Sequence, residues 1–182
     1  MEEVKLQNAW RFWHQKPQQG EVNWNQESDK MAILAEFDSV QQFWSIYNNL
    51  PPLSTLNYKE TFHLMKNVGP KSIKPVWEDP QNKNGGEWFL KIAINDAQEV
   101  WLNLNLALIG EQFKDKDMGY LGDEVCGLSA SLRTGIILFQ LWYKDSQNKD
   151  VILKSCLSLL PGNVKPIENP YSKDHHKNLV QK

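Results

Sequence analysis

The sequence contains few of the residues on which several classes of protein depend. Cysteine occurs only at Cys126 and Cys156, without the spacing of a metal site or a disulfide framework. Arginine occurs only at Arg11 and Arg133, and no apolar run reaches the roughly 18 residues that a membrane helix needs. The net charge of −2 leaves no basic excess to hold a polyanion without sequence preference. We therefore expect no membrane association, and any bound nucleic acid should be a small, locally recognised piece.

The length and the apolar content predict one domain. The chain has 182 residues, of which 41% are hydrophobic, enough to fill a single core. We expect a single monomeric domain over residues 1–182, with residues 1–4 and 171–182 flexible. Because no signal peptide is visible, the expected compartment is the reducing cytoplasm, and the nucleus stays open as a second one.

Hydrophobic periodicity predicts an α+β domain with a mostly antiparallel sheet. Strand patterns cover residues 6–14, 31–37, 61–66, 87–94, 124–133 and 136–143, with one more before the C-terminal tail. Helical patterns cover residues 40–50, 96–110 and 150–160. Asp38 or Ser39 is expected to cap the first helix, and Asp96 the second. The three helices should share one face of the sheet and leave the other face free.

The two strands at 124–143 are expected to form a hairpin with one small, polar face. Alternation assigns one face to Cys126, Leu128, Ala130 and Leu132, and the other to Gly127, Ser129, Ser131 and Arg133. A turn at residues 134–135 has either a two-residue or a four-residue loop. Both registers place Arg133 and Trp142 on the polar face, roughly 13–20 Å apart along the strands. A nucleotide with an extended phosphate tail is long enough to span that distance.

Trp77 and Glu78 carry the most specific chemistry in the sequence. They lie in a segment bounded by proline and glycine, which indicates a loop. An exposed tryptophan stacks a base, and a carboxylate accepts both adjacent N–H donors of guanine. The pair therefore describes a guanine pocket, although for this dipeptide alone a tryptophan that covers the core beside a solvent-facing glutamate is the more common arrangement. Trp24, in a polar loop, is either a second stacking surface or a cover for the sheet.

Enzymatic activity is not expected. Tryptophan beside carboxylates also suits sugars, but hydrolysis needs two separated carboxyl groups, and Glu78 and Asp79 are adjacent. His175 and His176 lack a third metal ligand nearby. We expect no catalytic residues, no cofactor and no metal, and keep a carbohydrate-binding module as a remote alternative.

Five ordered segments resemble eukaryotic initiation factor 4E, the messenger-RNA cap-binding family. They read LQNAWRFW at 6–13, FDSVQQFW at 37–44, VWEDPQNKNGGEW at 76–88, LIGEQF at 108–113 and DEVCG at 123–127. The resemblance covers nearly the whole chain. It implies a curved, mostly antiparallel eight-stranded sheet with three helices packed on its convex face, and a cap site in the concave front.

The resemblance also implies a role for each site residue. Trp24 and Trp77 would sandwich 7-methylguanine, and Glu78 would bind its N1–H and N2–H₂ edge. Trp142 would touch the methyl group, and Arg133 would hold the phosphates. Methylation at N7 gives the ring a positive charge, so stacking gains a cation–π contribution that plain guanine lacks.

The sequence departs from the family where further basic residues usually surround the phosphates. The aligned positions are Glu87, which is acidic, and Leu138, which is apolar. We therefore expect weaker and less salt-dependent binding of the cap than in a typical member, unless Lys144 or Lys173 substitutes.

A second surface is implied on the helical side. Val40, Trp44, Leu102 and Gly110 match the family positions that receive a helical peptide, either from a scaffold factor of the 4G type or from a 4E-binding inhibitor. The second predicted helix has an extra apolar stripe at Leu102, Leu106 and Ile109, for which burial is the alternative. The expected function is recruitment of capped messenger RNA to the initiation machinery. A cap-binding homologue that represses or stores messages is the alternative.

Overall fold

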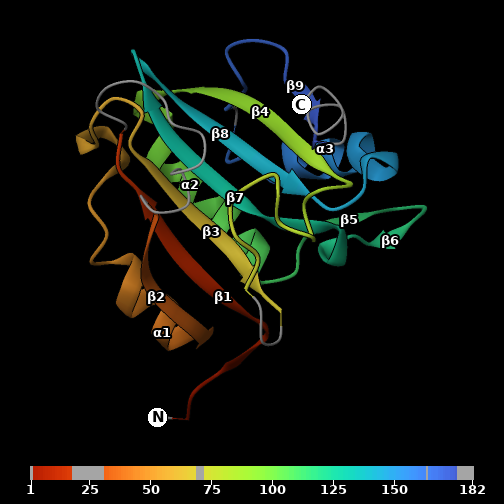
Figure 1. The fold of residues 1–182 in the computed structure, drawn as a ribbon, viewed down its shortest axis with the longest axis horizontal. Coiled ribbons are helices and arrows are strands. Elements are labelled where there is room, and N and C mark those ends of the chain that lie inside the picture. Colours follow the sequence, from red (N-terminus) through yellow and green to blue (C-terminus); the bar gives the residue numbers. More distant parts are fainter. Residues whose placement is uncertain (1, 18–30, 69–71, 163, 176–182) are drawn as a thin grey trace.

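A computed structural model describes residues 2–17, 31–68, 72–162 and 164–175. In this part of the chain the main sheet has seven strands, all paired antiparallel, in the order β2-β1-β3-β7-β8-β4-β9 (Figure 1). The strands are β1 (Lys5–Gln15), β2 (Met31–Ser39), β3 (Thr61–Asn67), β4 (Gly86–Ala93), β7 (Val125–Arg133), β8 (Ile136–Tyr143) and β9 (Tyr171–Asp174). A separate pair consists of β5 (Lys114–Asp115) and β6 (Gly119–Tyr120).

The expected number of eight strands is therefore wrong for the described residues. The seven strands that periodicity predicts are all present. The remaining extended segments, β5 and β6, pair only with each other and do not extend the sheet.

Three α-helices lie on one face of the sheet (Figure 1). They are α1 (Val40–Tyr47), α2 (Ile94–Ile109) and α3 (Lys149–Ser158), with short 3₁₀ turns at η3 (Leu53–Thr55), η4 (Gly122–Glu124) and η5 (Ser146–Asn148). Trp101 of α2 is 1% exposed, and its ring centroid lies 6.4 Å from that of Phe12 and 6.3 Å from that of Phe139. Within the described residues, no helix is long and apolar enough to span a membrane.

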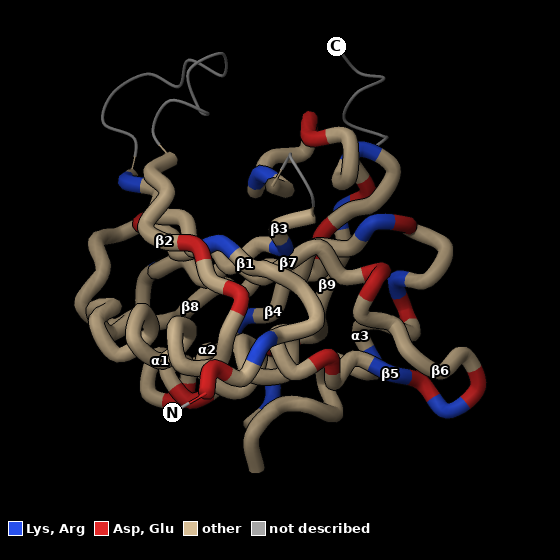
Figure 2. The backbone as a smooth tube through the Cα atoms, turned by 90° about the horizontal axis from the view of Figure 1, so that it is seen from below, with Lys and Arg blue, Asp and Glu red and all other residues tan. Residues whose placement is uncertain are grey.

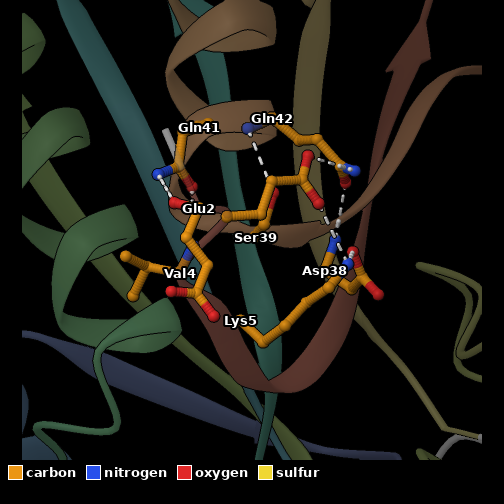
Figure 3. A network of polar contacts seen from close by, with 8 residues as sticks. Glu2, Val4, Lys5, Asp38, Ser39, Gln41 and Gln42 are labelled. Carbon is orange, nitrogen blue, oxygen red and sulfur yellow. Dashed lines mark hydrogen bonds and ion pairs between the residues drawn. The ribbon is translucent and has the colours of Figure 1, made fainter.

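A polar network fixes the start of α1 (Figure 3). The hydroxyl of Ser39 accepts from the backbone N–H of Gln42 at 3.3 Å, as a capping residue does, and the Gln42 side chain accepts in return from the N–H of Asp38 at 3.1 Å. The N–H of Val4 donates to the Gln41 side chain at 3.0 Å. The cap at Ser39 is confirmed, and residues 2–4, expected to be flexible, contact this helix.

The start of the second helix and the end of the first differ from the prediction for reasons that the structure shows. The second helix begins at Ile94 with Ala93 as its N-cap, so the predicted cap at Asp96 is wrong. The reason is that β4 pairs with β8 up to Ala93 and the helix follows without a loop; Asp96 lies in the first turn, where a carboxylate favours the helix dipole. The first helix ends at Tyr47 rather than residue 50, because residues 48–50 form tight turns.

A β-bulge changes the predicted alternation of β7. Val125 pairs with Tyr143 and Gly127 pairs with Trp142, which leaves Cys126 without a cross-strand partner. Val125 belongs to the core beneath the helices, whereas Cys126 packs with Trp142 on the opposite face. The assignment of Cys126 to the helical face is therefore wrong, while Leu128 and Ala130 lie in the core as predicted.

The end of the described chain is a strand rather than a flexible tail. Residues 171–174 form β9, which pairs with β4 at the edge of the sheet. His175, directly after it, is 1% exposed. Positions of Lys and Arg are interspersed with positions of Asp and Glu along the described backbone (Figure 2), in keeping with the small net charge.

Candidate functional site

The connection between β3 and β4 lies on the face of the sheet opposite α2 (Figure 1). Ile73 of this connection packs with Trp142 and Cys126 in a second, smaller apolar cluster. The thiol of Cys126 lies 3.9 Å from the carbonyl oxygen of Gln81, farther along the same connection. The segment that carries Trp77 and Glu78 is thereby placed against β7 and β8.

Two buried or half-buried side chains hold the loop in shape. Asn82 is fully buried, and its amide nitrogen donates to the carbonyl oxygens of Lys74 at 2.9 Å and Val76 at 2.8 Å. The Asp79 carboxylate accepts from the N–H of Lys74 at 3.0 Å. These bonds fix the backbone on both sides of Trp77, which is half-buried, and leave Glu78 exposed. The prediction that Trp77 lies in a loop is confirmed.

A buried histidine ties this loop to the sheet edge. The Nδ1 of His175 lies 2.8 Å from the carbonyl oxygen of Asn82, and its Nε2 lies 3.1 Å from a carboxylate oxygen of Glu87. The other Glu87 oxygen accepts from the side-chain amide of Gln140. The carbonyl oxygen of Asn82 can only accept, so Nδ1 donates to the loop, while Nε2 bonds the Glu87 side chain on β4. The backbone N–H of His175 also donates to the carbonyl oxygen of Gly85 at 2.9 Å.

Trp142 forms part of the floor of this face. It is 5% exposed, and its indole N–H donates to the hydroxyl of Ser129 at 2.8 Å. The same hydroxyl lies 2.7 Å from Nδ1 of His63. Burial, and to a smaller degree the nearby His14, lowers the pKa of His63 to about 3. The centre of the floor is therefore polar but carries no charge from His63 at neutral pH.

Arg133 lies at the other end of the same face. It pairs with Ile136, so the hairpin has the two-residue loop, and Gly135 adopts the left-handed conformation that this turn requires, with φ of 74°. Trp142 pairs with Gly127, six rows from Arg133, or about 20 Å along the strand. The guanidinium donates to the Ser131 hydroxyl and to the Leu132 carbonyl oxygen.

Four of the five predicted ligand-binding residues therefore come from elements on one face of the sheet. Trp77, Glu78, Arg133 and Trp142 belong to this set, whereas Trp24 lies outside the described residues. The anchoring roles of Asn82 and His175 are not visible in the sequence, because one depends on burial of a polar loop residue and the other on a contact with a distant segment. In the sequence, His175 stands out only because it is next to His176. In the described part of the chain, no group of three or more His, Cys, Asp or Glu residues could hold a metal ion.

The second predicted surface lies across α1 and the end of α2. Trp44 is 36% exposed, and its ring stands edge-on to Phe43 and Tyr47. Val40 and Leu102 are half-buried and Gly110 is exposed. Of the extra stripe on α2, Ile109 is buried, whereas Leu102 and Leu106 are only partly covered.

The sequence matches the family model for eukaryotic initiation factor 4E over residues 5–178. The chain belongs to this family. It is 36% identical to eukaryotic translation initiation factor 4E-1 of Triticum aestivum over 146 residues, which is 79% of this chain and 62% of that protein. It is 33% identical to initiation factor 4E of Dictyostelium discoideum over 145 residues, 79% of this chain and 54% of that one. The chain thus spans less than two thirds of the length of these two relatives.

Solved structures of factor 4E proteins share the fold. The complex of C. elegans eIF4E-3 with the 4E-binding protein Mextli and a cap analog superposes with a TM-score of 0.80, at 29% identity, covering 100% of this chain and 97% of that one. Ascaris suum eIF4E-3 with the m2,2,7G cap gives a TM-score of 0.78, at 29% identity, covering 96% and 92%. The α+β architecture predicted for this initiation factor 4E family member is thereby confirmed.

We expect His63 to make the fold of this factor 4E protein sensitive to acid. An unfolded histidine binds a proton near pH 6.5, but the pKa of the buried His63 is about 3. Between these values the unfolded state holds more protons, so the free energy of unfolding falls as the pH drops, by up to roughly 1.4 kcal/mol per pH unit from this group. Denaturant unfolding of the wild type and of His63→Ser at several pH values should show a shallower decline for the variant.

Ser129→Ala is the matched control, since it disturbs the same hydrogen bond but keeps the ionisable ring. It should retain the slope of the wild type. Equal slopes for the wild type and His63→Ser would show that His63 binds its proton in the folded state.

Proposed function

We propose that this chain binds the 7-methylguanosine cap of messenger RNA and recruits the message to the translation initiation machinery through a scaffold protein. The observation that carries the proposal is the anchored loop that presents Trp77 and Glu78 over the face that also holds Arg133. Two of the similar structures, from C. elegans and Ascaris suum, contain a cap analog and the m2,2,7G cap.

The recognition of the base rests on Trp77, Trp24, Glu78 and Trp142. Trp77 would stack one face of the base and Trp24 the other, with a cation–π contribution from the methylated ring. Glu78 is exposed, so its carboxylate is available to accept from N1–H and N2–H₂ of guanine. The nearly buried Trp142 would provide the floor against which the methyl group rests.

The phosphates would depend mainly on Arg133. Glu87 directs its carboxylate to His175 and Gln140, and Leu138 pairs with Ser131 and is half-buried. Neither side chain offers a positive charge. Lys173 is exposed and pairs with Glu87 across β4 and β9, which makes it a candidate substitute. These features support weaker and less salt-dependent binding of the cap than in a family member with a full set of basic residues.

The helical face would bind the partner. Val40, Trp44, Leu102 and Gly110 would receive a helical peptide from a scaffold of the 4G type or from a 4E-binding inhibitor. The similar C. elegans structures contain the 4E-binding protein Mextli. A homologue that represses or stores messages would use the same cap site, so competition between scaffold and inhibitor peptides, followed by a translation assay, separates the two functions.

Glu78→Ala should weaken binding of 7-methyl-GTP by at least about tenfold. The variant would lose the two hydrogen bonds that the Glu78 carboxylate accepts from a positively charged base. One hydrogen bond to a charged group contributes about 1.5–3 kcal/mol. Tryptophan fluorescence titrated with 7-methyl-GTP and with GTP measures both affinities. Glu99→Ala, at an exposed position of α2, is the control and should bind as the wild type does. If GTP binds the wild type as tightly as 7-methyl-GTP does, the proposed cap specificity is wrong.

Leu138→Lys should tighten binding of 7-methyl-GTP and make it more sensitive to salt. The new ammonium would stand on the same face as Arg133 and contact the phosphates, and each such contact adds to the dependence of affinity on salt. Titrations at a series of salt concentrations give the slope. Leu138→Met keeps the volume without the charge and should leave the salt dependence of the affinity unchanged. If Leu138→Lys also left it unchanged, the phosphates would not lie near position 138.

Trp44→Ala should weaken binding of a scaffold-type helical peptide by more than about tenfold, because central tryptophans commonly dominate such interfaces. Binding of 7-methyl-GTP should not change. Leu157→Ala is a suitable control, since Leu157 on α3 is also 36% exposed. Peptide binding measured by calorimetry tests both variants, and an equal loss in both would contradict the assignment of this surface.

A further inference from the structure

A second aromatic surface lies at the sheet edge formed by β4 and β9. Phe89 and Tyr171 are direct cross-strand partners, and their rings are stacked with centroids 4.8 Å apart and 6° between the planes. Phe89 also pairs with Gln140, which in turn pairs with Ser129 of the floor beneath Trp142. The stacked pair is therefore on the same face as the candidate cap site, yet no role assigned to the cap uses it.

The outer ring of this stack, Tyr171, is partly exposed. The distance between the centroids matches the spacing of about 4.7–4.9 Å between neighbouring strands, so the rings stack in the direction that crosses the sheet. Phe89 covers one face of Tyr171, and β9 is the edge strand of the main sheet. Phe89 is 7% exposed, whereas Tyr171 is 41% exposed. Tyr171 therefore retains exposed area that the Phe89 ring does not cover.

Two cationic side chains lie near this ring pair. The ammonium of Lys173 lies 5.2 Å from the centroid of the Phe89 ring. Tyr171 is also near Arg133: burial lowers the pKa of Arg133, and the phenol groups of Tyr58 and Tyr171 are close enough to oppose that effect. Exposed aromatic rings interleaved with cations are the features with which proteins bind single-stranded nucleic acid.

We propose that Tyr171 stacks the base of the nucleotide that follows the cap, with Phe89 as its support and Lys173 beside the backbone phosphates. The proposal rests on the cap-binding function. The ligand is a ribonucleotide joined through the triphosphate bridge to the methylated guanosine. Every base has a π face, so this contact adds affinity without selecting a sequence.

The distances along the sheet suit such a ligand. Phe89 and Tyr171 lie in the row of Gln140, two rows from Trp142 along the strand and toward Arg133. Across the sheet, Tyr171 is two strands from Trp142. With about 3.3 Å per residue along a strand and about 4.8 Å between strands, the two residues are roughly 12 Å apart. A triphosphate bridge with the second ribose spans that separation, and its phosphates would pass between Arg133 and Lys173.

The test compares three ligands on one protein: 7-methyl-GTP, the capped dinucleotide 7-methyl-GpppA, and the same dinucleotide without its adenine base. The wild type should bind the dinucleotide about fivefold more tightly than the abasic form, a factor typical of one base stacked on an aromatic ring. Tyr171→Leu, which still packs on Phe89, should abolish that ratio and leave the affinity for 7-methyl-GTP unchanged. Tyr171→Phe should keep the ratio.

Tyr58→Leu is the matched control, because Tyr58 is 55% exposed and is also near Arg133. It should retain the ratio of the wild type; loss of the ratio in Tyr58→Leu but not in Tyr171→Leu would overturn the proposal. Equal binding of the dinucleotide and its abasic form by the wild type would also overturn the proposal. If the wild type still bound 7-methyl-GTP in that case, the proposed cap function would stand. Failure of the wild type to bind 7-methyl-GTP would overturn the cap function and this proposal together.

Discussion

Burial of one face of the sheet against α2 is the interaction on which the candidate site depends. Trp101 of α2 packs near Phe12 of β1 and Phe139 of β8. Leu128 and Ala130 of β7 are fully buried in the same core. Because side chains alternate along a strand, this packing assigns Ser129 and Ser131 to the other face. The small, polar floor beneath the Trp77 loop is therefore a consequence of how the core is packed. A change that shifted β7 by one residue would exchange the two faces and remove the site.

The loop itself is held by contacts that join distant parts of the chain. Asn82 satisfies two carbonyl groups within the loop, and its own carbonyl oxygen is bonded by His175, which follows the last described strand. The pairing of β9 with β4 brings His175 to this position. The presentation of Trp77 and Glu78 thus depends on the C-terminal strand as well as on the loop sequence. This arrangement also explains why β9 is ordered although its sequence is polar.

The sequence was sufficient for features that depend on local pattern, and insufficient for those that depend on pairing. The strand and helix positions, the Ser39 cap and the shared face of Arg133 and Trp142 all follow from periodicity and turn chemistry. The bulge at Cys126 does not, because it requires a count of residues on the partner strand. The contact between His175 and Glu87 joins residues 88 positions apart, and nothing in either local sequence indicates it. The role of Asn82 depends on its burial, which a polar loop sequence does not reveal.

Glu87 shows how the structure changes the meaning of a sequence difference. From the sequence, an acidic residue at a position that is usually basic in the family indicates only a lost contact with phosphate. In the structure both carboxylate oxygens are engaged, one by Gln140 and one by His175. A basic residue at this position would add a positive charge on the face proposed to bind the cap, but it would meet the donor group of Gln140 and lose the bond to His175 that anchors the Trp77 loop. Under the proposed cap function, the carboxylate at position 87 would exchange strength of phosphate binding for a fixed Trp77 loop.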